Sequence, residues 1–329
     1  MANVIIGIHG LGNKPPRTML ENWWKLAMIE GLENANLKTV LPKFEMVYWA
    51  DVMYDRPLDE SETHVESPYF LDEKYVKGMK VDSVEDHSLR MKVVDFLGRQ
   101  LNRIFLNEDF TLNYSFITDT LVRKYFRDLE IYYSEGSAPF DSSGQKAKDL
   151  IRGRLLQVLE KYHKDNIMLI AHSMGSIIAF DVLTFLAPHL NIHTLVTIGS
   201  PLGLPIVVSK IAAEQKQIKT QENHMVTPPG IVGCWYNFSD IQDGVAFDYK
   251  LSDNFMENSY GVKPADFLVR NDYAVNGVSN PHKSFGYLRT PEFAGLLNEF
   301  ILSEKLTLKE KLVRRSSQFI SRFRSFLEK

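Results

Sequence analysis

Short β-prone runs alternate with helix-prone stretches along this chain, and this alternation limits the folds that it can adopt. Residues 4–8 form an apolar run without polar alternation, which is typical of a strand buried on both faces. We expect a helix over 18–32, started by a capping box of Thr18 and Glu21, and then a strand over 44–49. Strand–helix–strand order predicts an α/β fold with a mostly parallel central sheet and helices on both faces.

The same alternation returns in the second half of the chain. It predicts helices over 147–162, 176–186 and 291–302, and strands over 167–171, 195–198, 233–238 and 267–270. Sequential strands separated by helices favour one continuous sheet rather than two unrelated halves.

Residues 51–140 interrupt the alternation. Their first part is acidic and rich in turn-forming residues, and 88–106 and 114–133 are predicted to form two aromatic-rich amphipathic helices. We therefore predict a core made of 1–50 and 141–303, with 51–140 as an inserted helical cap or lid over the site. A separate domain without a role at the site is the alternative interpretation.

The composition excludes several classes of protein. Hydrophobic residues make up 44% and charged residues 24% of the 329, which is ordinary globular usage. A net charge of −3 provides no general positive field for nucleic acid. The single cysteine, Cys234, allows neither an intrachain disulfide nor a cysteine-rich metal site, and we expect no metal and no cofactor.

The sequence also bears on the compartment of the protein. No apolar run approaches the ~18–20 residues of a membrane-spanning helix. The run at 4–8 is too short for the apolar region of a signal peptide, and no basic residue precedes it. We expect a cytoplasmic protein.

The strongest local signal is Ala171-His172-Ser173-Met174-Gly175, between a predicted strand and a predicted helix. A nucleophilic serine at such a turn projects its hydroxyl clear of the sheet. The residues two before and two after it are small because the strand and helix backbones come close there. Ala171 and Gly175 meet this demand. Ser173 is therefore our candidate nucleophile, with His172 and Gly175 in its supporting turn; a serine in an ordinary strand–helix turn is the alternative.

A serine hydroxyl requires a base, and the chain has nine histidines. His282 lies in a late loop just before the last predicted helix, from which it could reach the carboxyl edge of the sheet. A histidine on the surface is the alternative interpretation of this position. We predict that His282 is the base.

Three aspartates that follow the strand over 233–238 are candidates for the acid that orients the base: Asp240, Asp243 and Asp248. We choose Asp243, because it lies a few residues past the strand end on a turn that Gly244 permits. Asp240 could instead form a turn, which is a common role of aspartate in loops. The predicted chain order is then serine, aspartate, histidine.

Acyl transfer from an ester also requires donors for the developing oxyanion. The backbone N–H of Met174, directly after the serine, is one expected donor. The loop His9-Gly10-Leu11-Gly12 follows the first predicted strand, where a second donor is needed. Its glycines let the chain turn tightly enough to aim the Leu11 amide inward, with His9 and Gly10 as supporting residues. A plain glycine turn is the alternative.

On these motifs the chain resembles the α/β-hydrolase superfamily, and within it the serine esterases and lipases. The resemblance covers 1–50 and 141–303, with Ala171 at a position that is more often glycine in the superfamily. The matching segments are 9–12, 171–175, 199–203, 243–245 and the loop around His282.

The resemblance implies hydrolysis of a small-molecule or lipid ester through an acyl-enzyme, without a cofactor. The same residues could act on thioesters or transfer the acyl group to an alcohol. A protein of another class, binding a lipid or a partner on the same fold without catalysis, is the other alternative.

Residues 304–329 carry an excess of lysine and arginine around apolar residues at helical spacing. They predict a basic amphipathic helix whose apolar face must be covered. Its own domain, a second copy of the chain or an anionic membrane surface could cover it, so self-association and peripheral membrane binding are both open.

Overall fold

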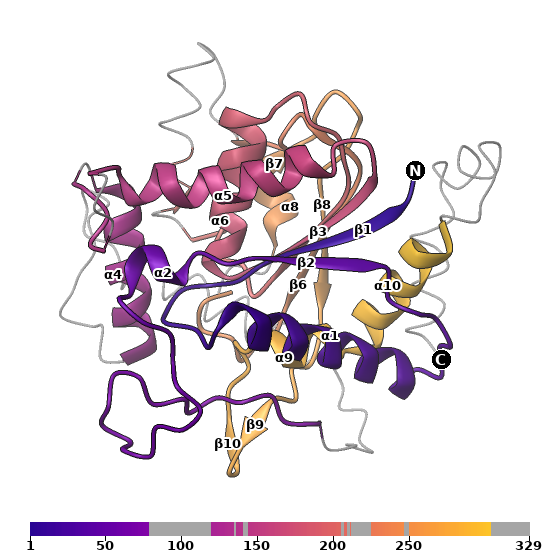
Figure 1. The fold of residues 1–329 in the computed structure, drawn as a ribbon. Helices are drawn as coiled ribbons and strands as arrows, with labels where there is room; N and C mark the ends of the chain where they lie inside the picture. The colour runs from indigo at the N-terminus through magenta and orange to yellow at the C-terminus, as the bar shows by residue number, and fades with distance from the viewer. Residues whose placement is uncertain are drawn as a thin grey trace.

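The computed structural model describes residues 1–78, 120–134, 136–140, 144–204, 207–208, 211, 225–246 and 250–303. At its centre lies a six-stranded sheet in the order β2-β1-β3-β4-β6-β8, in which every neighbouring pair is parallel (Figure 1). The strands are β1 (Asn3–Ile8), β2 (Lys43–Val47), β3 (Asn166–His172), β4 (Ile192–Ile198), β6 (Ile231–Ser239) and β8 (Pro264–Leu268). The predicted parallel α/β sheet is therefore confirmed.

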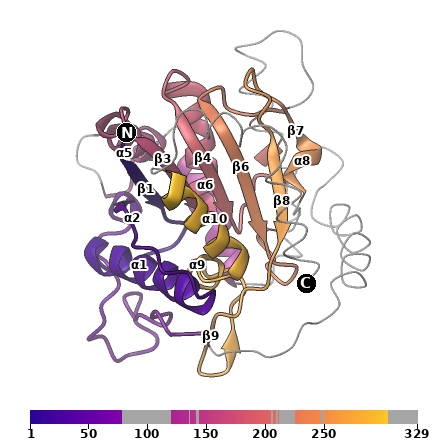
Figure 2. The ribbon, with the colours of Figure 1, turned by 90° about the vertical axis from the view of Figure 1, so that its right-hand side faces the viewer.

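Neighbouring residues of a strand point to opposite sides of the sheet, and helices cover both sides. Ile5 packs with the helices on one face, and Ile6 packs with those on the other. On the first face lie α1 (Arg17–Asn34), α9 (Ser284–Leu288) and α10 (Pro291–Ser303) (Figure 2). On the second lie α5 (Ala147–Lys161), α6 (Met174–Asp181) and α4 (Thr120–Tyr133).

Short elements complete the described chain. They are α2 (Ala50–Met53), the π-helical turn Val182–Leu186, α8 (Leu251–Asn254), the parallel pair β5 (Met225–Val226) and β7 (Phe255–Met256), and the antiparallel pair β9 (Ala274–Val275) and β10 (Val278–Ser279). The helix predicted over 176–186 thus begins two residues earlier, and its last part is π-helical.

The predicted capping box at the start of α1 is wrong. Pro16, with φ of −49°, precedes the first helical residue, and its carbonyl already accepts from Met19 and Leu20. Thr18 therefore lies inside the first turn, where it caps nothing. Glu21 instead pairs with Lys25 one turn later. The Pro16 carbonyl is thus already the first acceptor of the helix, so the serine/threonine signal two residues later is not used.

The described parts of 51–140 contain one helix of the predicted pair. α4 coincides with most of the second predicted helix, whereas residues 54–78 follow an irregular path with one isolated bridge, between Asp59 and Phe70. The helix predicted over 88–106 and the basic helix over 304–329 lie outside the described residues. Within the described ranges, no helix combines the length and the apolar character that crossing a membrane requires.

The strand order changes direction between β1 and β3. The chain leaves β1 for α1 on one face of the sheet, and it leaves β3 for α6 on the other. In open α/β sheets, ligands bind in the crevice that such a reversal opens outside the carboxyl ends of the strands. The loop 9–12 follows β1 and Ser173 follows β3, so both sequence-predicted segments lie at this position.

Candidate active site

Ser173 occupies a strained turn between β3 and α6. Its φ of 53° and ψ of −128° are rarely adopted by residues other than glycine. Its backbone N–H donates to the carbonyl of Ile198 on the next strand, at 3.0 Å. At Gly175, an added Cβ would lie 2.7 Å from the Ile8 carbonyl oxygen, so this position tolerates no side chain. The close backbone approach expected from the sequence is therefore present.

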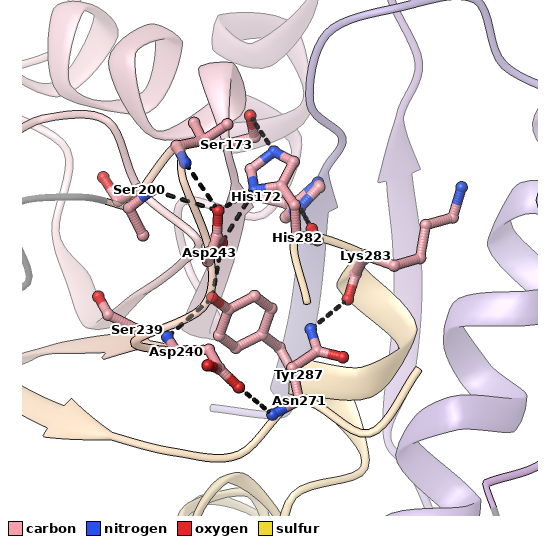
Figure 3. A network of polar contacts seen from close by, with 12 residues as sticks. His172, Ser173, Ser200, Ser239, Asp240, Asp243, Asn271, His282, Lys283 and Tyr287 are labelled. Atoms are coloured by element: carbon pink, nitrogen blue, oxygen red, sulfur yellow. Dashed lines mark hydrogen bonds and ion pairs between the residues drawn. The ribbon is translucent and has the colours of Figure 1, made fainter. Parts of the chain in front are cut away.

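Ser173 is the first member of a continuous chain of hydrogen bonds. The His282 Nε2 atom lies 2.9 Å from Ser173 Oγ, and Nδ1 lies 2.9 Å from each carboxylate oxygen of Asp243 (Figure 3). All three residues are buried. Because the carboxylate accepts a hydrogen bond from Nδ1–H, that nitrogen carries the ring proton and Nε2 is left with its lone pair toward the serine hydroxyl. The structure thus brings together the three residues predicted from sequence.

The Asp243 carboxylate is fully hydrogen-bonded. Besides His282, it accepts from the backbone N–H of Val245 at 2.9 Å and of Ala246 at 3.3 Å. Gly199, with φ of 54°, borders it, and a Cβ there would lie 2.9 Å from Asp243 Oδ2 and 3.2 Å from His282 Nδ1. The pair of Asp243 and His282 therefore fits only against a glycine.

Sequence reasoning missed Tyr287, on α9. Its hydroxyl donates to Asp243 Oδ2 at 2.7 Å and accepts from the backbone N–H of Asp240 at 3.0 Å. Burial and then the charge of Asp243 raise the pKa of Tyr287 well above its usual value, which keeps the hydroxyl a donor. The spacing of Tyr287 and Asp243 in the chain contains no signal for this contact.

Asp240 has a different role from Asp243. Its two oxygens accept from the backbone N–H groups of Gln242, at 2.7 Å, and Asn271, at 2.6 Å, which is the turn-forming role that the sequence left open. Burial raises the pKa of Asp240. The structure shows no contact between Asp240 and His282, and Asp248 lies outside the described residues. Of the two described candidates, only Asp243 contacts the base.

His172 holds the loop that carries His282. Its Nε2 atom lies 2.7 Å from the backbone carbonyl oxygen of His282, to which it donates, and the two rings are 4.9 Å apart. Burial, and then the neighbouring His282, lower the pKa of His172 well below its usual value. On the other side of the loop, the His282 N–H donates to Asn280 Oδ1 at 3.0 Å. His172 is therefore a neutral support for the base.

His9 orients the loop that follows β1. Its Nδ1 atom donates to the Gly10 carbonyl at 2.8 Å, while Nε2 accepts from the Trp49 backbone N–H at 3.0 Å. Burial lowers the pKa of His9 well below its usual value, so the ring is neutral. In a trans peptide the N–H points opposite to the carbonyl, and no cis peptide occurs in the described chain. The Leu11 N–H therefore points away from the His9 ring.

The two predicted oxyanion donors both lie next to Ser173. A Cβ on Gly10 would come within 2.6 Å of Ser173 Cβ, so the loop carrying Leu11 passes directly against the serine. Met174 is the first residue of α6, and the backbone N–H groups in the first turn of a helix have no intrahelical acceptors. Among the described residues, neither amide has a protein acceptor.

A pair of buried serines supports the turn. Ser176 Oγ donates to the Ser173 carbonyl at 2.6 Å and lies 2.8 Å from Ser200 Oγ, which accepts from the Leu202 N–H at 3.3 Å. This links the turn after β3 to the segment 199–203 after β4. In the described ranges, no three His, Cys, Asp or Glu side chains are placed to bind a metal together.

Comparison with protein-family models and with curated proteins identifies no relative. No protein-family model matches the chain, and no curated protein is significantly similar to it. The geometry of the site therefore has to carry any functional proposal.

Proposed function

We propose that this protein is a serine hydrolase that cleaves carboxylic esters, of either small molecules or lipids. The observation that carries the proposal is the buried hydrogen-bond chain from Asp243 through His282 to Ser173, with the serine on a strained turn. Nucleophile, base and orienting acid within hydrogen-bond distance are the arrangement that activates a serine hydroxyl.

The proposed reaction has two stages. Ser173 Oγ attacks the acyl carbonyl carbon while His282 Nε2 takes the hydroxyl proton, and Asp243 stabilises the imidazolium that forms. His282 then gives this proton to the departing alcohol oxygen as the ester bond breaks, which leaves the acyl group on Ser173. Water, deprotonated by His282, attacks the acyl-enzyme, and the carboxylic acid leaves as the serine recovers its proton. Neither stage needs a metal or an organic cofactor.

The tetrahedral intermediates of both stages carry negative charge on the former carbonyl oxygen. We propose that the backbone N–H groups of Leu11 and Met174 donate to this oxygen. The support is their position beside Ser173 and their lack of protein acceptors in the described chain. Donors fixed before the reaction stabilise the transition state more than the substrate, which raises kcat.

We also propose that the fold is that of the α/β-hydrolases, with residues 51–140 as its cap. The parallel sheet, the serine turn after β3 and the order of serine, aspartate and histidine along the chain support the fold. Contacts of the insert with both site loops support the cap. Glu73 pairs with Lys283, beside the base, at 2.5 Å, and Asp128 accepts from the Gly12 N–H at 2.7 Å.

A serine-directed fluorophosphonate probe and a series of p-nitrophenyl esters of increasing acyl length test the function. The wild type should be labelled and should hydrolyse at least part of the series. Ser173→Ala should lose the label and about 10⁴-fold or more of kcat. Ser239→Ala is a matched control, because Ser239 is a buried serine at the carboxyl end of β6 with no contact to the base.

Each outcome separates the alternatives. A folded Ser173→Ala variant that keeps its label and its turnover would refute the proposal. A wild type that neither reacts with the probe nor cleaves any ester would favour the non-catalytic binding protein. Faster acyl transfer to an added alcohol than to water, or a preference for thioesters, would redefine the reaction of the same three residues.

A further inference from the structure

A buried carboxylate of the inserted segment reaches the loop that follows β1. Asp128, on α4, is 1% exposed, and its Oδ2 atom accepts from the backbone N–H of Gly12 at 2.7 Å. The hydroxyl of Tyr54 also donates to this carboxylate, at 3.0 and 3.2 Å to its two oxygens. The contact joins positions 116 residues apart in the chain.

A cation holds the other end of the same peptide group. The Lys14 ammonium donates to the Leu11 carbonyl, and it lies 3.1 Å from the Gly12 carbonyl oxygen. The Leu11 carbonyl and the Gly12 N–H belong to one planar peptide unit. A carboxylate therefore binds its N–H and an ammonium binds its oxygen, and charged partners make each of these hydrogen bonds strong.

This peptide unit directly follows the unit that carries the Leu11 N–H. Gly12 has φ of 81°, and glycine adopts positive and negative φ with similar ease, so local sterics do not choose its orientation. Hydrogen bonds from side chains must choose it. His9 binds the preceding carbonyl, of Gly10, and Asp128 with Lys14 binds the following unit. Two consecutive peptide planes around Leu11 are thereby fixed.

We propose that Asp128 is a positioning residue, through which the inserted helix α4 sets the direction of the Leu11 amide toward the oxyanion. The inference rests on the proposed hydrolase function and adds to it a specific dependence on a residue outside the core. Asp128 itself touches no reacting atom, and it acts through the Leu11–Gly12 peptide.

The proposal predicts a selective kinetic effect. Deleting an oxyanion donor costs about 10²–10³-fold in kcat, and a donor that is misdirected rather than removed should cost less, about 10- to 100-fold. KM should change less than about 2-fold, because the donor is needed in the transition state and not in the bound ester. Asp128→Asn keeps an oxygen that can accept from Gly12, so it should recover most of the kcat lost in Asp128→Ala.

Two measurements test this effect on the full-length protein. The first is kcat and KM on the best p-nitrophenyl ester of the series. The second is the inhibition constant of phenylboronic acid, whose tetrahedral adduct with Ser173 places an oxygen where the oxyanion would lie. Both kcat and boronate affinity should fall by a similar factor in Asp128→Ala.

Tyr132→Phe is the matched control on the same helix. The Tyr132 hydroxyl donates to buried Asp181 at 2.7 Å, so this variant also removes one buried hydrogen bond of α4 but leaves the loop untouched. Its kcat and boronate affinity should stay at wild-type values. Equal losses in Tyr132→Phe and Asp128→Ala would mean that Asp128 only anchors α4, and would overturn the proposal.

The remaining outcomes also decide the question. An unchanged kcat and boronate affinity in folded Asp128→Ala would overturn the proposal that Asp128 positions the Leu11 amide. If Asp128→Ala does not fold, Lys14→Met at a half-buried position tests the same peptide from its other end, and an unchanged kcat there would overturn it. A wild type without turnover or phosphonate labelling would instead refute the function itself, and the inference with it.

Discussion

The two sides of Ser173 are held in different ways. On the side of the base, His282, Asp243 and Tyr287 all come from core segments, after β6 and around α9, and they form one buried network. On the side of the loop 9–12, glycines supply a pliable backbone, and its orientation depends partly on Asp128 in the insert. The side chains of the proposed proton-transfer network therefore all come from the core, and the insert reaches only the surrounding base loop, through Glu73. The proposed oxyanion loop, by contrast, is bound directly by a side chain of the insert.

The difference has a physical origin. A buried carboxylate must be fully hydrogen-bonded, and Asp243 takes its donors from a turn, a tyrosine and the base itself, all within the core. In the loop 9–12, the two glycines have no side chains with which to fix the peptide planes beside them. The orientation of the loop then depends on its own His9 ring and on two partners outside it, the ammonium of Lys14 and the carboxylate of Asp128.

The largest expected effect in this comparison lies within the base side. Asp243→Asn keeps the shape but removes the charge that stabilises the imidazolium, and we expect kcat to fall by about 10⁴-fold. Asp240→Asn is the matched variant, because Asp240 is also buried but serves a turn. Steady-state kinetics of both variants check this. A crippled Asp240→Asn beside an active Asp243→Asn would contradict the assignment of the acid.

A smaller loss of kcat is expected when Tyr287 is substituted. Tyr287→Phe removes one hydrogen bond to a charged acceptor, worth about 1.5–3 kcal/mol. Because Asp243 keeps its bonds to Val245 and Ala246, we expect only about a 10-fold fall in kcat, with KM unchanged. Tyr273→Phe is the control, since that buried hydroxyl donates to the Lys74 carbonyl at 2.7 Å and not to the acid. Equal kcat losses in the two variants would reduce Tyr287 to a packing role.

The smallest effect compares one buried histidine from each side. The pKa of His9 and of His172 is lowered in the fold, so below about pH 6.5 the unfolded chain binds protons that the folded chain does not. The free energy of unfolding should therefore fall as the pH drops from about 6.5 toward the lowered folded pKa values. Each histidine contributes up to about 1.4 kcal/mol per pH unit.

Urea denaturation between pH 7.5 and 5.5 measures this slope. His9→Gln and His172→Gln should each reduce the slope of the unfolding free energy against pH by up to about 1.4 kcal/mol per pH unit, which corresponds to one proton. The double variant should reduce it by up to about twice as much. A slope that neither substitution changes would show that these rings do not stay neutral in the fold. A change in only one of them would distinguish the loop side from the base side.

Much of the fold could be predicted from local patterns. Apolar runs such as 4–8 and 167–171 identify buried strands because no polar residue interrupts them, and the intervening helices imply that the strands run parallel. The small residue at Gly175 follows from the serine turn, and an added Cβ there would meet the Ile8 carbonyl. The start of α1 was mispredicted because Pro16 outweighs the Thr18 and Glu21 pattern.

By itself the sequence identified Ser173 as the candidate nucleophile, because its signal lies within five neighbouring residues, and it favoured Asp243 and His282 among several loop positions as the acid and the base. The tertiary structure decided the contacts themselves: Asp243 meets His282 as the sequence had favoured, whereas the contacts of Tyr287 with Asp243 and of Asp128 with Gly12 had no sequence signal. These contacts join residues 39, 44 and 116 positions apart. The residues around a polar side chain in the sequence are the same whether that side chain faces solvent or a buried partner. Only the packing of distant elements decides which of these two environments it occupies.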